Sequence, residues 1–205
     1  MNILNLVAAA ALGYLLGSIP FGYLVGSLWG VDVREEGSGR TGGTNVWRAT
    51  HRTIPVALTL FGDTFKGVAA VLIARNFLEP PEATAALAGA AAVLGHIWPL
   101  FLNFNGGAGG STAAITWIAL NPVVGIPNLI YALFVFAFGR YASLATLTVG
   151  VSGVILAVLL LIVRPDLVGI WDVVFGLIVT IAMVITLQPN LRRLRQGSER
   201  RIDLW

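Results

Sequence analysis

A segment rich in glycine and polar residues, at positions 37–48, has the composition of an anion-binding loop. It reads Gly-Ser-Gly-Arg-Thr-Gly-Gly-Thr-Asn-Val-Trp-Arg. Glycines let backbone N–H groups close around an anion, a following helix start adds a positive dipole, and Arg48 can grip phosphate oxygens. The glycine spacing also matches a dinucleotide-binding fingerprint, but no β-α-β pattern surrounds it. We therefore expect a phosphate-binding loop between helices, with a flexible interhelical turn as the alternative.

A second glycine-rich segment, at positions 105–112, reads Asn-Gly-Gly-Ala-Gly-Gly-Ser-Thr and leads into an apolar stretch. Backbone N–H groups at such a helix start can also surround an anion. Ser111 lacks the second glycine of a nucleophile elbow, so the sequence does not support nucleophilic serine chemistry. The alternative is a re-entrant or close-packed turn. The preceding His96 is expected to be a packed, hydrogen-bonded histidine.

Asp63 and Lys66 stand three positions apart inside an apolar stretch, so they share one helix face and can pair. Ionisable groups at such depth are costly unless they are paired or functional. A structural pair is the favoured interpretation. The chain has no cysteine, which removes disulfides, thiolate catalysis and cysteine-bound metals. No metal site and no cofactor are expected.

The composition determines where these motifs must lie. Of the 205 residues, 57% are hydrophobic and only 11% are charged, whereas charged residues make up about a quarter of a soluble domain. The chain therefore has too little charge to cover a globule, and soluble enzymes and disordered chains are poor interpretations. Its basic residues fall in loops and a tail instead of on one folded face, so no nucleic-acid partner is expected.

The apolar residues form seven stretches, which predict an all-α, polytopic membrane protein with one integral membrane domain over 1–205. The stretches cover 3–29, 53–77, 83–101, 112–120, 123–138, 142–163 and 170–187, and a basic tail follows at 188–205. A crossing helix needs about 20 residues, so the fourth is too short to cross untilted. Six spans with a re-entrant segment remain an alternative.

Arginine and lysine near helix ends predict the orientation, because cytoplasmic loops carry an excess of them. With seven spans, ten arginines fall on one side, while Arg75 and Arg164 fall on the other. The N-terminus is therefore expected outside and the C-terminus in the cytoplasm. The glycine-rich loops and the basic tail would share the cytoplasmic face.

These motifs, in this order, resemble the bacterial acyl-phosphate:glycerol-3-phosphate acyltransferases, the PlsY family. The resemblance covers nearly the whole chain. It is carried by residues 14–22, by 37–39 and 43–46 with Arg48, by 63–67, by Gly95 and His96 with Pro99, by the glycine-rich loop, by Arg140 with Ser143, and by Asn190 with Arg193. It implies a seven-helix enzyme of the bacterial inner membrane whose active site faces the cytoplasm.

Enzymes of this family pass a fatty acyl group from acyl phosphate to glycerol 3-phosphate, which gives lysophosphatidate for phospholipid biosynthesis. The resemblance implies substrate-binding roles for Ser38, Gly39, Gly43, Thr44, Asn45, Arg48, Ser143, Asn190 and Arg193. It implies backbone donors at Gly107 and Gly109 and assigns no side chain as acid or base. Donors aimed at a developing oxyanion suit acyl transfer. Membrane lipids would surround the protein.

The chain departs from the family pattern at several site positions. The family's glycine-rich loop typically reads Phe-Lys-Gly-Gly-Lys-Gly, but here the lysine positions hold Asn105 and Ala108. A usual histidine is replaced by Leu187, and Arg40 replaces an asparagine-like residue. The sequence thus predicts a divergent acyltransferase. Two alternatives are a catalytically impaired relative that binds a phosphorylated ligand or lipid, and, more distantly, a small permease.

Overall fold

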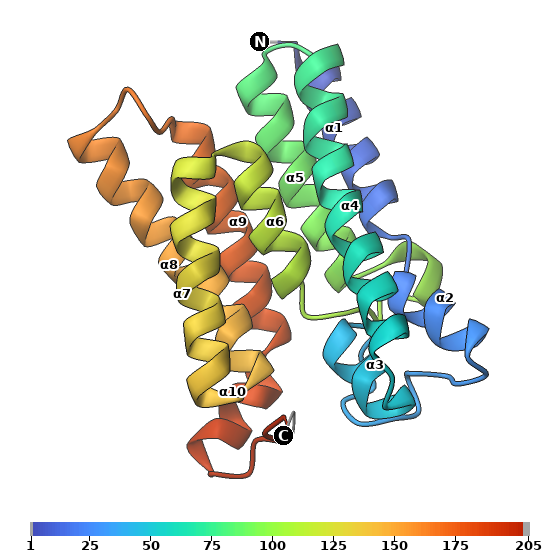
Figure 1. Cartoon of the computed structure of the whole chain (residues 1–205). Coiled ribbons are helices and arrows are strands. Elements are labelled where there is room, and N and C mark those ends of the chain that lie inside the picture. The colour runs from blue at the N-terminus through green and yellow to red at the C-terminus, as the bar shows by residue number, and fades with distance from the viewer. Residues whose placement is uncertain (1, 203–205) are drawn as a thin grey trace.

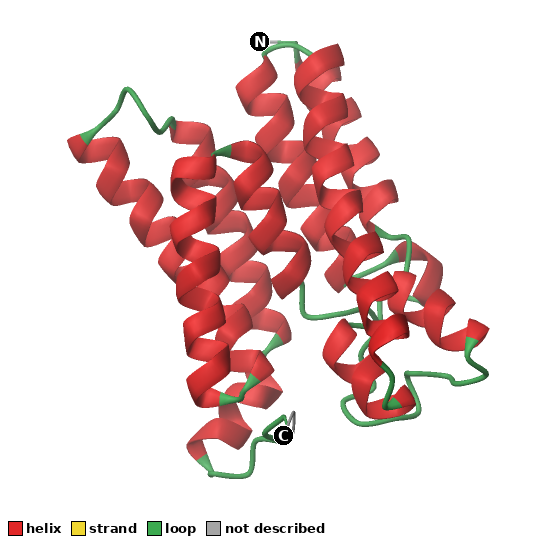
Figure 2. Ribbon diagram, in the orientation of Figure 1, coloured by secondary structure: helices red, strands yellow, loops and turns green. Residues whose placement is uncertain are grey.

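The computed structural model describes residues 2–202, and the regular structure in that range is entirely helical (Figure 2). This confirms the predicted all-α class. In chain order the helices are α1 (Ile3–Gly17), α2 (Phe21–Leu28), α3 (Gly43–Thr50), α4 (Thr53–Phe77), α5 (Pro81–Ile97), the 3-10 helix η1 (Leu100–Leu102), α6 (Gly110–Leu120), α7 (Pro122–Gly139), α8 (Ala142–Val163), α9 (Ile170–Thr186) and α10 (Gln188–Arg195).

The helices form two groups that meet along α5 and α6. Helices α1, α4 and α5 pack together on one side, and α7, α8 and α9 pack together on the other (Figure 1). Helix α6 contacts both α4 and α7, and α5 contacts α9. Helix α1 begins at the end of the bundle opposite to α10 (Figure 1).

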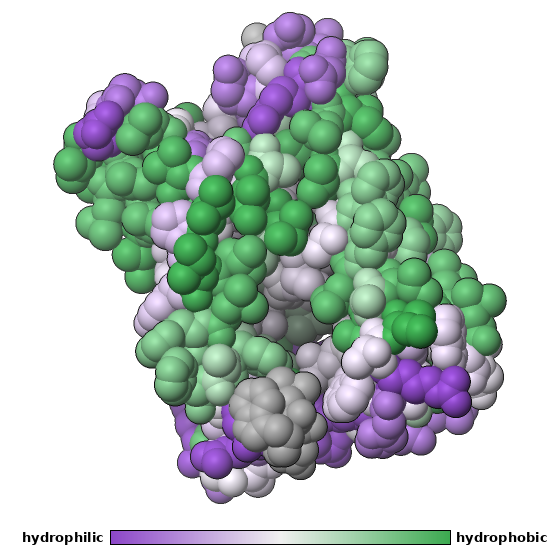
Figure 3. Space-filling model, viewed as in Figure 1, coloured by the Kyte–Doolittle hydropathy of each residue, from purple (hydrophilic) through white to green (hydrophobic). Residues whose placement is uncertain are grey.

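Five helical segments in the described range are long and apolar enough to cross a membrane. They are Ile3–Leu28, Thr53–Phe77, Pro81–Leu102, Pro122–Gly139 and Ala142–Val163, and α9 with α10 would make a sixth, bent by 62°. On the face that Figure 3 shows, hydrophobic residues form a broad band, with hydrophilic residues toward its two ends. These features fit a protein that lies in a bilayer. The seven-span count stays a prediction.

Two predicted stretches differ from simple spans. The first is divided into α1 and α2 by residues 18–20, where Pro20 has no N–H for a helical hydrogen bond. The fourth becomes α6, whose 11 residues extend only about 16 Å, roughly half of a hydrocarbon core. The glycine-rich segment before α6 is not helical and does not lengthen it. Helix α6 therefore leaves space between α4 and α7 along part of their length.

Small residues let α1 and α5 approach closely. Gly13 and Gly17 of α1 lie against the backbone at Ala88 and Ala92 of α5. Helices in lipid gain little from the hydrophobic effect when they associate, so close packing of small residues stabilises such contacts. In the segment 81–102, which includes α5, 72% of an apolar 18-residue stretch is buried inside the protein, against 22–39% in the other four segments. Helix α5 is thus the central helix of the bundle.

We predict that Gly13→Ala destabilises the protein by about 1–3 kcal/mol, because the added Cβ would overlap the Ala88 carbonyl. Alanine favours an isolated helix more than glycine does, so helix propensity acts in the opposite direction. Thermal unfolding in detergent measures the change. Gly139→Ala in α7 is the control, since its Cβ would meet Leu144 at an ordinary 3.8 Å. Equal melting temperatures for the two variants would contradict the prediction.

Candidate active site

One cavity of about 380 Å³ lies between the two groups of helices, where the surface is hollowed (Figure 3). Its polar walls come from the α2–α3 loop and α3, the glycine-rich loop, the start of α8, the α9–α10 corner and the chain after α10. Its apolar walls come from α4, α6, α7 and α8 and are formed by Leu60, Ala114, Ile115, Leu129, Ala132, Leu133, Phe136, Ala145 and Val149. The cavity is therefore amphipathic.

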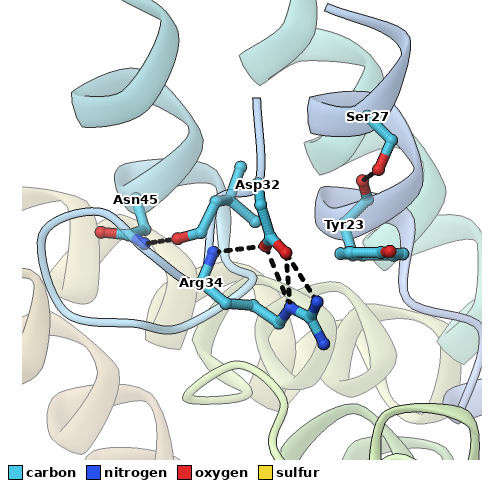
Figure 4. Close-up of polar contacts among 6 residues, drawn as sticks. Tyr23, Ser27, Asp32, Arg34 and Asn45 are labelled. Atoms are coloured by element: carbon cyan, nitrogen blue, oxygen red, sulfur yellow. Dashed lines mark hydrogen bonds and ion pairs between the residues drawn. The ribbon is translucent and has the colours of Figure 1, made fainter. Parts of the chain in front are cut away.

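Asn45 organises the α2–α3 loop from within. Its Nδ2 donates to the carbonyls of Val33 at 2.6 Å, Glu36 at 3.0 Å and Arg40 at 2.8 Å. Its Oδ1 accepts from the N–H of Ser38 at 3.0 Å. The side chain is 2% exposed and turns toward the loop backbone (Figure 4). Asn45 lines the cavity, but its amide is occupied in shaping the loop.

Arg34 lies in the same loop and is bound by a neighbouring residue. It donates to Asp32 from Nε at 2.9 Å and from Nη2 at 2.6 Å, and it lies 4.5 Å from the centre of the Tyr23 ring (Figure 4). These hydrogen bonds lower the pKa of Asp32 to about 2. Arg34 does not line the cavity, whereas Arg40, Arg48 and Arg200 do.

The structure brings most of the predicted site residues to the cavity. Those in its walls are Ser38, Gly43, Thr44, Asn45, Arg48, Gly109, Ser143 and Asn190. Gly39, Gly107 and Arg193 are not among the lining residues. Gly39 has a φ of 70°, a left-handed conformation that favours glycine, and so forms the turn behind Ser38.

The glycine-rich loop folds back onto the end of α5. The N–H of Gly106 donates to the carbonyl of Ile97 at 3.2 Å, and the N–H of Gly107 donates to the carbonyl of His96 at 3.0 Å. Gly109, with a φ of 84°, caps the start of α6 at the cavity wall. The Gly107 donor is thus used within the protein, while Gly109 and the start of α6 lie at the cavity. Their catalytic roles stay predictions.

Asp63 and Lys66 form the predicted pair, and His96 joins them. Asp63 Oδ1 lies 3.0 Å from Lys66 Nζ and 3.3 Å from His96 Nδ1. Lys66 Nζ also donates to the carbonyl of Ile19 at 3.0 Å, at the break between α1 and α2. All three charged or polar side chains are less than 5% exposed. His96 also lines the cavity and packs against Gly107, so this cluster supports the glycine-rich loop.

Glu199 is a site residue that the sequence reasoning missed. Its Oε1 accepts from Ser143 Oγ at 2.9 Å and Asn190 Nδ2 at 2.7 Å, and its Oε2 accepts from Arg193 Nε at 2.8 Å. Burial acts to raise the pKa of Glu199, but the hydrogen bonds from Asn190, Arg193 and Ser143 outweigh burial and lower it. Its position as an acidic residue in a basic tail was the available signal.

Positive charge dominates the polar end of the cavity. Arg40, Arg48 and Arg200 line it, whereas Glu199 is the one carboxylate among its described lining residues. Burial lowers the pKa of Arg40 and of Arg48, and the charges of Arg193 and Arg200, respectively, lower them further. Arg200 also donates to the carbonyl of Gly37. The cavity therefore suits a ligand with an anionic head and an apolar chain.

Fold and cavity together define a helical membrane protein with an amphipathic cavity. The model of the family described as "Glycerol-3-phosphate acyltransferase" matches residues 7–197, and the chain belongs to this family. The predicted family is thus confirmed.

Relatives and solved structures match nearly full length. A glycerol-3-phosphate acyltransferase of Rubrobacter xylanophilus is 44% identical, over 95% of this chain and 94% of the relative. A glycerol-3-phosphate acyltransferase of Geobacter sulfurreducens is 38% identical, over 97% of this chain and 98% of the relative. The crystal structure of PlsY (YgiH), an integral membrane glycerol 3-phosphate acyltransferase, in its glycerol 3-phosphate form, has a TM-score of 0.83 and 33% identity, covering 96% of this chain and 95% of that chain.

We predict that Asp63→Asn or Lys66→Met alone destabilises the protein by about 3–5 kcal/mol, because each leaves a buried charge without its partner. The double variant should lose less than the sum of the two single losses, since no unpaired charge remains at the pair. Unfolding of the four proteins in detergent gives the coupling energy. Strictly additive losses would contradict a coupled pair.

We predict that Glu199→Gln lowers stability by about 1–2 kcal/mol at neutral pH, because a charged hydrogen-bond acceptor is lost. The folded pKa of Glu199 lies below its ordinary value of 4.5, so its contribution is present above that value. This contribution is lost as the pH falls through the folded pKa. The difference between wild type and Glu199→Gln should therefore shrink in acid, as measured by unfolding from pH 7 to pH 3.

The exposed residue Glu35 supplies the control variant Glu35→Gln, which should match wild type at neutral pH. A difference between wild type and Glu199→Gln that stays constant across the pH range would contradict the assigned role of the carboxylate.

Proposed function

We propose that this chain transfers a fatty acyl group from acyl phosphate to the 1-hydroxyl of glycerol 3-phosphate, which gives lysophosphatidate for phospholipid biosynthesis. The observation that carries the proposal is a cavity that joins a cationic, glycine-lined end to an apolar end between membrane helices. Membership of the glycerol-3-phosphate acyltransferase family supports it, as does the similar structure described as a glycerol 3-phosphate form.

The polar end supplies groups for substrate phosphate. Arg48 offers a planar pair of donors to phosphate oxygens, and Ser38 and Thr44 add hydroxyls in the same walls. Gly43 opens α3, so the positive end of that helix dipole faces the cavity. We assign Ser143, Asn190 and Arg193 to this end of the site, where they are held around Glu199.

The reaction needs stabilisation of an oxyanion more than a strong base. The acceptor hydroxyl oxygen would attack the acyl carbon, the bond from that carbon to the phosphate oxygen would break, and phosphate would leave with the electron pair. Gly109 and the start of α6 would direct backbone N–H groups toward the developing oxyanion. The departing phosphate can take the hydroxyl proton. The apolar walls on α6, α7 and α8 would hold the acyl chain.

We also propose that the polar end of the cavity faces the cytoplasm of a bacterium, with the N-terminus outside and seven crossing segments that include the short α6. The excess of arginine in the α2–α3 loop and after α10 supports this orientation. The placement of the start of α1 and of α10 at opposite ends of the bundle agrees with an odd number of crossings (Figure 1). The basic chain after α9 would then be cytoplasmic.

A catalytically impaired relative that binds phosphorylated ligand or lipid is the second candidate. Ala108 and Leu187 both line the cavity, at the positions where the resemblance implied a lysine and a histidine. Each change removes a polar or cationic group from the polar end. This observation favours reduced turnover with retained binding.

We predict that the purified protein forms lysophosphatidate from palmitoyl phosphate and radiolabelled glycerol 3-phosphate. Arg48→Ala should lower kcat/KM about a hundredfold, as expected for loss of one group that stabilises transferring charge. Product is measured by thin-layer chromatography against a heat-inactivated control. Absence of product above that control at several pH values would overturn the acyltransferase proposal.

The double variant Ala108→Lys/Leu187→His separates the two candidates in the same assay. A large gain in turnover over wild type would identify an impaired enzyme whose remaining site is intact. Wild-type turnover without such a gain would identify an active enzyme that works with its own residues.

A further inference from the structure

Arg40 connects two elements at the polar end of the cavity. It lies in the α2–α3 loop and lines the cavity. Its Nη2 donates at 2.6 Å to the carbonyl of Thr186 at the end of α9. This contact joins the first loop to the α9–α10 corner. It also holds the guanidinium beside Leu187, a buried residue that offers no polar side chain to the cavity.

The positive charge of Arg40 has no carboxylate in contact with it among the residues that the structure describes. The carbonyl of Thr186 is its hydrogen-bond acceptor there. The nearby carboxylate of Glu199 is already bound by Ser143, Asn190 and Arg193. A guanidinium carries five N–H donors, so several remain for a further acceptor.

The surroundings of Arg40 destabilise its positive charge unless an anion lies beside it. Burial lowers the pKa of Arg40 and the charge of Arg193 lowers it further, while the carboxylate of Glu199 acts in the opposite direction without cancelling them. Arg48 and Arg200 line the same cavity. Taking a charged group out of water is costly unless an opposite charge accompanies it. An anion that enters this cavity would offset both the burial of Arg40 and the repulsion among the arginines.

We propose that Arg40 binds the phosphate group of a phosphomonoester or acyl phosphate substrate, together with Arg48, in the site of the proposed function, on which this inference rests. A guanidinium matches two phosphate oxygens with parallel N–H donors. The Thr186 carbonyl fixes the guanidinium before the ligand arrives, which lowers the entropy lost on binding. Arg40 thus supplies phosphate recognition at the Leu187 side of the cavity.

The test measures ligand binding and turnover separately. Wild type, Arg40→Gln, Arg40→Lys and the control Arg52→Gln are placed in lipid nanodiscs, and glycerol 3-phosphate, inorganic phosphate and glycerol are titrated by calorimetry. Arg52 is exposed and does not line the cavity. Arg40→Gln should raise the Kd of the bound phosphate ligand at least about tenfold, as the loss of a charged hydrogen bond predicts. Arg40→Lys should fall between, and Arg52→Gln should match wild type.

Turnover with palmitoyl phosphate identifies the source of the phosphate. A higher Kd and KM for glycerol 3-phosphate in Arg40→Gln assigns Arg40 to the acceptor. A higher KM for palmitoyl phosphate alone, with an unchanged Kd for glycerol 3-phosphate, assigns it to the donor. Either result supports the proposal.

The other outcomes overturn the proposal. The first is that Arg40→Gln keeps wild-type affinities and KM values. The second is that this variant has a lower melting temperature with unchanged ligand affinity, which indicates a purely structural role. The third is that the wild type binds no phosphate ligand. Phosphate binding that depends on Arg40 without acyl transfer would instead uphold this inference and overturn the proposed function.

Discussion

The burial of the Asp63 carboxylate is the constraint on which much of the structure depends. A carboxylate in the interior of a membrane bundle is costly unless donors match it, and Lys66 and His96 supply donors to its Oδ1. Lys66 brings the break between α1 and α2 against α4 through the Ile19 carbonyl. His96 carries the constraint to the glycine-rich loop, because its carbonyl accepts from Gly107 and its ring packs on that glycine. One buried charge thus connects the helix framework to a wall of the cavity.

The short length of α6 explains why a cavity exists at that place. A full-length helix between α4 and α7 would fill the space with side chains. Helix α6 instead starts at Gly110, beside the cavity, and runs only to Leu120. The glycine-rich loop before α6 lies against the end of α5 and adds backbone, with little side-chain volume, to the cavity wall. Exposed backbone polar groups are tolerated at membrane depth only beside protein or a polar cavity. The same feature therefore provides both space for a chain and donors for a head group.

The sequence predicted the parts of the site that depend on local composition. Glycine with Ser, Thr, Asn and Arg marked the first loop, and Asn121-Pro122 marked the end of the short fourth stretch. Contacts between distant residues were not predictable in this way. The His96 contact with Asp63 and the Glu199 contacts with Ser143 and Asn190 join separate helices or the tail. The substrate-binding role of Asn45 stays a prediction, but only the folded loop reveals that its amide meets three loop carbonyls.

The balance of charge at the cavity links the departures from the family pattern to the rest of the site. Ala108 and Leu187 leave the glycine-rich loop and the α9–α10 corner without charge in the cavity wall. The arginines that remain come from the first loop, from α3 and from the chain after α10. Glu199 pairs with Arg193, and within residues 2–202 no carboxylate is in contact with Arg40 or Arg48. The positive charge of the cavity wall therefore comes from the first loop, α3 and the chain after α10, and not from the glycine-rich loop or the α9–α10 corner.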